Sequence, residues 1–66
     1  MSRPPFDELV HRVNNLLGTI EVQAEVARTD GSLAAHAAAL QQILDSARRT
    51  QDDVRRLRAA MREQAG

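Results

Sequence analysis

The 66-residue sequence contains no cysteine, no tryptophan and no tyrosine, and it has a single phenylalanine. Without cysteine, neither a disulfide framework nor a cysteine zinc site can stabilise so short a chain. Its two histidines stand in unrelated contexts, so we expect neither a metal site nor a cofactor. Because a chain of this size buries little surface on folding, oligomerisation is the remaining common route to stability.

An excess of charge of one sign is also missing. Nine arginines balance nine acidic residues, and there is no lysine. This balance, with almost no aromatic residues to stack on bases, argues against nucleic acid or a membrane as the partner. No stretch approaches the roughly 20 apolar residues of a transmembrane helix, and the start lacks the apolar core of a signal peptide. The sequence therefore predicts a soluble, cytoplasmic chain.

The apolar residues that are present recur at helical spacing. From Phe6 onward, steps of three and four residues predict a first helix over about 5–28. Pro5 suits the first turn of this helix, because its missing N–H has no helical acceptor there. Asp7 and Glu8 follow, close to the positive end of the helix dipole, where acidic side chains are favourable.

The segment 29–32, Thr-Asp-Gly-Ser, predicts a turn. Gly31 is suited to a left-handed cap of the first helix, and Ser32 to the N-cap of the second. The second helix is expected over about 33–63, since no glycine or proline interrupts it. Its predicted apolar seam consists of His36, Leu40, Ile43, Ala47, Thr50, Val54, Leu57 and Met61. Because His36 lies on this seam near the turn, we expect it to be structural rather than functional.

Arginines concentrate near the end of the second helix, at Arg55, Arg56, Arg58 and Arg62. Asp52 and Asp53 lie within one turn of Arg55 and Arg56, so local pairing on a solvated face explains them.

These elements predict an all-α fold: one helical-hairpin domain over 1–66, with antiparallel helices because the turn is short. Both apolar stripes are wider than one hairpin can cover. We therefore expect a homodimer in which two hairpins pack about a twofold axis as a four-helix bundle. A chain that buries its own stripes, or an extended coiled coil, is the less favoured alternative.

One face of the first helix is unusual. At about 100° per residue, His11 lies about 160° from the centre of the apolar stripe, so it points to solvent. Asn15, Gly18 and Val22 follow one, two and three turns along the same line. This strip is exposed but uncharged, which is typical of a surface that another protein contacts.

Residues 8–20, Glu-Leu-Val-His-Arg-Val-Asn-Asn-Leu-Leu-Gly-Thr-Ile, resemble the phosphoacceptor box of two-component sensor histidine kinases. Residues 40–49, Leu-Gln-Gln-Ile-Leu-Asp-Ser-Ala-Arg-Arg, are similar to the second helix of the same dimerisation and phosphotransfer domain. The resemblance covers nearly the whole chain. It implies that His11 carries a phosphoryl group and that Asn15 positions phosphoryl oxygens or an attacking water. It also implies that a partner docks on Arg12, Gly18 and Val22.

The function implied is that of a phosphorelay module, which passes a phosphoryl group between His11 and an aspartate of a response-regulator receiver domain. A histidine kinase would be a further partner. Many of these kinases have an acidic residue directly after the histidine. This chain has Arg12 there, as some subfamilies of these kinases do. With no ATP-binding domain, the chain alone is not expected to be a kinase. It is a separate phosphotransfer protein, a remnant that only dimerises, or a piece of a longer kinase. The competing interpretation is a non-catalytic dimerisation or scaffold module that binds a partner without phosphorylation.

Overall fold

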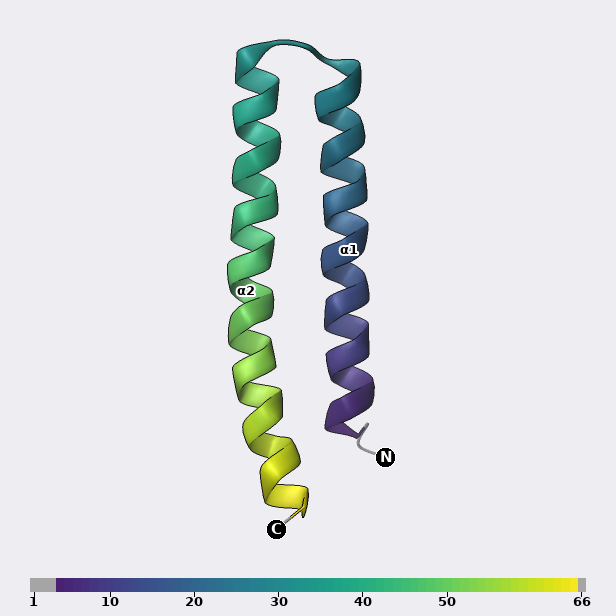
Figure 1. Cartoon of the computed structure of the whole chain (residues 1–66), viewed down its shortest axis with the longest axis vertical. Helices are drawn as coiled ribbons and strands as arrows, with labels where there is room; N and C mark the ends of the chain where they lie inside the picture. The colour runs from purple at the N-terminus through teal and green to yellow at the C-terminus, as the bar shows by residue number, and fades with distance from the viewer. Residues whose placement is uncertain (1–3, 66) are drawn as a thin grey trace.

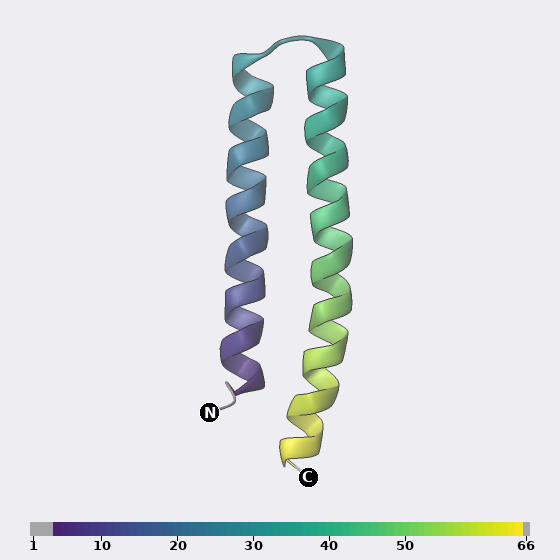
Figure 2. The ribbon, with the colours of Figure 1, turned by 180° about the vertical axis from the view of Figure 1, so that it is seen from behind.

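The computed structural model describes residues 4–65, which form two long helices joined by a short turn (Figure 1). Helix α1 spans Pro5–Thr29 and helix α2 spans Leu33–Ala65. The helices lie side by side in opposite directions and form a rod of 51 × 18 × 14 Å, as both views show (Figure 2). The predicted antiparallel helical hairpin is thus confirmed, and each helix ends within two residues of the predicted position.

Helix α1 begins as its sequence predicts. Pro5 is the first helical residue, preceded by Pro4 in an extended conformation with φ −59° and ψ 145°. The first helical hydrogen bond runs from the N–H of Glu8 to the carbonyl of Pro4 at 3.2 Å. Asp7 and Glu8 lie in the first turn, where the exposed N–H groups favour negative charge.

The end of α1 differs from the prediction. No glycine in the described chain has a positive φ, so Gly31 does not form a left-handed cap. Instead, Asp30 is extended, with φ −118° and ψ 106°, and its N–H donates to the carbonyl of Val26 at 3.0 Å. The N–H of Ser32 in turn donates to the Asp30 carboxylate at 2.9 Å. An aspartate side chain, and not the predicted glycine, therefore closes the turn.

Helix α2 starts at the predicted N-cap. The Ser32 hydroxyl accepts a hydrogen bond from the N–H of Ala35 at 3.1 Å, which satisfies one free donor of the first turn. One turn into the helix, Nε2 of His36 lies 2.8 Å from the carbonyl oxygen of Ala27. A carbonyl only accepts, so this nitrogen carries the proton. His36 is exposed, yet it satisfies a carbonyl in the last turn of α1, which is a structural role.

The contact between the helices has a small core. Leu57 and Ala39, at 3% and 2% exposure, are the buried apolar residues of the described chain, and Ser46 is a buried polar one. The predicted apolar seam of α2 therefore coincides only in part with the surface that contacts α1. Leu57 belongs to it, but Leu40 is 67% exposed, whereas Ser46 lies outside the predicted seam and is buried. The apolar stripe of α2 is wider than one neighbouring helix can cover, so spacing alone did not show which edge faces α1.

Most of the large apolar side chains that remain exposed lie on one side of the hairpin. We call this surface the outer apolar face: Phe6, Val10, Val13 and Leu17 from α1, with Leu33, Leu40 and Leu44 from α2. At 100° per residue, the α1 residues and the α2 residues of this face each lie about 105–120° around their helix from the interhelical contact. Both groups point to the same side of the hairpin. A groove of about 320 Å³, lined almost wholly by apolar atoms and including Leu40 and Ile43, lies between the helices on this side.

Candidate functional site

The four residues of the predicted strip are all exposed in α1: His11, Asn15, Gly18 and Val22. Helical geometry places them within about 60° of one another, and about 115° from the contact with α2. They lie on the side opposite the outer apolar face. The imidazole of His11 is therefore accessible along a rigid helix, away from the surface with the most apolar side chains.

Packing within the hairpin does not require a glycine at position 18. A Cβ at Gly18 would meet no other atom within 4 Å. Glycine in the interior of a helix costs about 0.5–1 kcal/mol relative to alanine, so the residue is not there for helix stability. A shallow depression adjoins it, lined by Asn14, Asn15, Gly18, Thr19, Val22 and Gln23. This depression leaves room for the backbone of a partner to approach.

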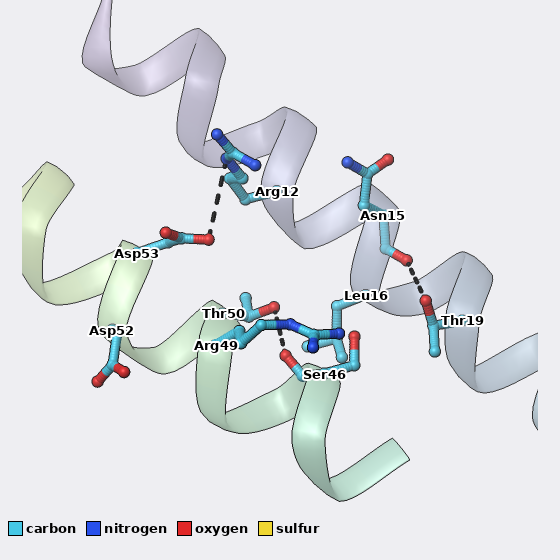
Figure 3. Close-up of a pocket in the computed structure, with 9 residues that line it drawn as sticks. All are labelled: Arg12, Asn15, Leu16, Thr19, Ser46, Arg49, Thr50, Asp52 and Asp53. Carbon is cyan, nitrogen blue, oxygen red and sulfur yellow. Dashed lines mark hydrogen bonds and ion pairs between the residues drawn. The ribbon is translucent and has the colours of Figure 1, made fainter. Parts of the chain in front are cut away.

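The side chain of Asn15 is available for an external ligand. Its backbone carbonyl accepts a hydrogen bond from the Thr19 hydroxyl at 3.1 Å. Its side-chain amide makes no hydrogen bond to any other described residue, and it points away from α2 (Figure 3). An amide offers two donors and one acceptor oxygen, which are suited to phosphoryl oxygens or to a water molecule.

Arg12 departs from the expected docking strip. Its side chain turns toward α2, where Nε lies 3.9 Å from a carboxylate oxygen of Asp53 (Figure 3). The guanidinium is therefore at the edge of the interhelical groove, and it can take part in docking only from that edge.

Ion pairs join the helices at their open end. Arg56 reaches Glu8 of α1 at 3.2 Å and Asp53 of its own helix at 3.5 Å. The pKa of Arg56 is raised, chiefly because its guanidinium donates to Glu8. The predicted local pairs Arg55–Asp52 and Arg56–Asp53 are both present at 3.5 Å. The link to Glu8 was not predicted, because the two residues lie 48 positions apart in the chain.

Sequence reasoning also missed a polar groove of about 480 Å³ between the helices (Figure 3). Helical geometry places it on the same side as the exposed strip. Ser46 is buried at this level, and the Thr50 hydroxyl donates to its carbonyl at 2.8 Å. The groove is lined by Arg12, Asn15, Leu16, Thr19, Ser46, Arg49, Thr50, Asp52 and Asp53. The available signal was Ser46 and Thr50, two small polar residues on the inner face of a helix that is otherwise apolar there.

Within residues 4–65, no group of three or more histidine, aspartate or glutamate side chains is placed to hold a metal ion. The same part of the chain has no helix with the length and apolar character needed to cross a membrane. Chemically, the site offers an exposed nucleophilic imidazole, an amide one turn away and a polar groove. No known family model, curated protein or solved structure matches the chain.

Proposed function

We propose that this chain is a histidine phosphotransfer module of a two-component or phosphorelay system. The observation that carries the proposal is the exposed imidazole of His11, one helical turn before the free amide of Asn15 on an uncharged strip. Imidazole is a good nucleophile at neutral pH. Phosphoryl transfer depends on positioning and access more than on elaborate acid–base groups, and an exposed residue on a straight helix supplies both.

The reaction is an exchange with an aspartyl phosphate of a receiver domain. The lone pair of a His11 ring nitrogen forms the N–P bond while the P–O bond to the aspartate breaks, and the carboxylate leaves. Transfer to a receiver is the reverse step. In this scheme, Asn15 orients the phosphoryl oxygens or a water, while Gly18 and Val22 accept the docking helix and Arg12 contacts it from the side.

The module is proposed to act as a homodimer. A hairpin with two buried apolar residues exposes too much apolar surface to be stable alone, and Leu33 is 85% exposed. Pairing two outer apolar faces about a twofold axis would form a four-helix bundle. Because His11 lies on the opposite side, this pairing would leave it open to a receiver or a histidine kinase.

Transfer from a phosphorylated receiver tests the proposal. His11→Gln keeps size and polarity but removes the nucleophile, so we expect it to abolish labelling of the chain. The matched control is His36→Gln, which changes the only other imidazole and should leave transfer unchanged.

Docking is tested separately at position 18. Gly18→Arg should block receiver binding through bulk and charge. Gly18→Ala should weaken binding less, since its methyl group meets no other atom of the hairpin and takes up little of the space left for a partner. Asn15→Ala should leave His11 able to accept phosphate but alter the rate of dephosphorylation. Equal binding by both Gly18 variants would argue against this docking surface.

A non-catalytic scaffold is the second candidate. The outer apolar face favours it, because most of the large exposed apolar residues lie away from His11. In a scaffold, His11→Gln would leave every partner-dependent activity intact. That result would favour the second candidate over the first.

A further inference from the structure

We propose that the polar groove between α1 and α2 binds a tetrahedral oxyanion, a phosphate group, between Arg12 and Arg49. The groove has side chains of both charges, and they differ in whether they already have an ion-pair partner. Asp52 pairs with Arg55 at 3.5 Å, and Asp53 pairs with Arg56 at 3.5 Å. Both of these arginines lie outside the groove. Each of the two carboxylates therefore has an arginine partner outside the groove, and Arg56 also pairs with Glu8 at 3.2 Å.

The positive charges of the groove are less well compensated. Arg49 has no carboxylate partner within 4 Å among residues 4–65, and its side chain lines the groove (Figure 3). Arg12 contacts Asp53 through Nε at 3.9 Å, which is long for an ion pair. Since Asp53 also has Arg56, Arg12 can turn to an incoming anion without leaving a carboxylate unpaired.

Neutral groups complete the site. The hydroxyls of Thr19 and Thr50 donate to carbonyls of their own helices. The hydroxyl of Ser46 makes no hydrogen bond within the described chain and points into the groove (Figure 3). A groove of about 480 Å³ exceeds the volume of one phosphate, so the ion would keep part of its hydration. Two guanidinium groups and one hydroxyl form a donor set suited to an oxyanion.

This proposal does not depend on phosphorylation of His11, which does not line the groove. The ligand is either free phosphate or a phosphate monoester carried by another molecule, because both present the same oxygens. Inorganic phosphate and O-phosphoserine are therefore separate arms of the test. Acetate is the planar anion for comparison.

The experiment is a titration of the ¹⁵N-labelled full chain with each anion, followed by NMR at constant ionic strength. We expect saturable shifts at the Nε–H groups of Arg12 and Arg49, for phosphate but not for acetate. Similar saturation with O-phosphoserine would indicate that the site accepts a monoester, and saturation with inorganic phosphate alone would restrict it to the free ion.

Arg49→Gln should weaken phosphate binding by about threefold or more, as expected when one charge-assisted hydrogen bond at a partly exposed site is lost. Arg48→Gln is the matched control, because it removes the same charge from an exposed neighbour that does not line the groove. Asp53→Asn should strengthen binding, since it releases Arg12. Non-saturating shifts with phosphate, or equal weakening by the Arg48 and Arg49 variants, would overturn the proposal. Arg49→Lys, with helicity checked by circular dichroism, separates loss of the guanidinium from loss of fold.

Discussion

The stability lost in Leu40→Ala distinguishes a homodimer from a hairpin that is stable alone. Full burial of a leucine side chain contributes about 1.5–3 kcal/mol. In the hairpin, 67% of Leu40 is exposed, so about two-thirds of that contribution is available only to a partner. If the outer apolar faces pair, the substitution should cost about 1–2 kcal/mol per chain, or about 2–4 kcal/mol per dimer. A lone hairpin should lose at most the remaining third, about 0.5–1 kcal/mol.

The assay is urea unfolding followed by circular dichroism at several protein concentrations. Dimerisation makes the midpoint rise with concentration, and light scattering should give twice the chain mass of 7.3 kDa. Leu57→Ala is the control, because Leu57 is 3% exposed within the hairpin and should cost about 2–5 kcal/mol in either state. A midpoint independent of concentration, with Leu40→Ala costing no more than a lone hairpin would lose, would refute the dimer.

Three further predictions concern the turn and the chemistry. His36→Gln should cost about 0.5–1 kcal/mol in urea unfolding, because the imidazole bond to the Ala27 carbonyl is lost; an unchanged midpoint would contradict this. The pKa of Asp30 is lowered from its usual 3.8, chiefly because the Ser32 N–H donates to it. The stabilisation by the Asp30 carboxylate should therefore be complete above about pH 5, and it should be lost as the pH falls below 3.8 through the lower pKa of the folded state. The thermal midpoints of wild type and Asp30→Asn should converge only in acid. Finally, the chain alone should not accept phosphate from ATP, and autophosphorylation in a radiolabel assay would contradict that expectation.

The parts of the fold that depend on local chemistry were predictable. Pro5 marks the start of α1, and Ser32 caps α2 as expected, because both effects involve residues within one helical turn. The exposure of His11 and Asn15 also followed from helical periodicity alone. For the same reason, the ion pair between Asp52 and Arg55 was visible in the sequence.

Features that depend on tertiary placement were not predictable. Glycine and aspartate both favour turns, and only the backbone shows that Asp30, not Gly31, closes this one. Spacing identified Leu40 as apolar but did not show that it faces away from α1. The polar groove could not be predicted because its two arginines, Arg12 and Arg49, come from different helices, and only the register of the hairpin shows that they line one groove.

The two proposed contacts, with a second copy of the chain and with a phosphotransfer partner, use opposite faces of the hairpin. Dimerisation would use the outer apolar face, which includes Leu17 and Leu40, and transfer would use the strip that includes His11. Since these surfaces lie on opposite sides, a substitution on one should leave the other unaffected. Leu40→Ala at a protein concentration that maintains the dimer should therefore accept phosphate normally.

The most direct test of the account is to locate the phosphate after incubation with an active histidine kinase or a phosphorylated receiver. A phosphorus–nitrogen bond is labile in acid and stable in base, so ³¹P NMR and peptide mass spectrometry under basic conditions identify both the bond and the residue. We predict an acid-labile phosphate on His11 that is absent from His11→Gln, while the variant keeps its helicity and self-association. Phosphate on His36, label undiminished in His11→Gln, or no labelling by any donor would contradict it.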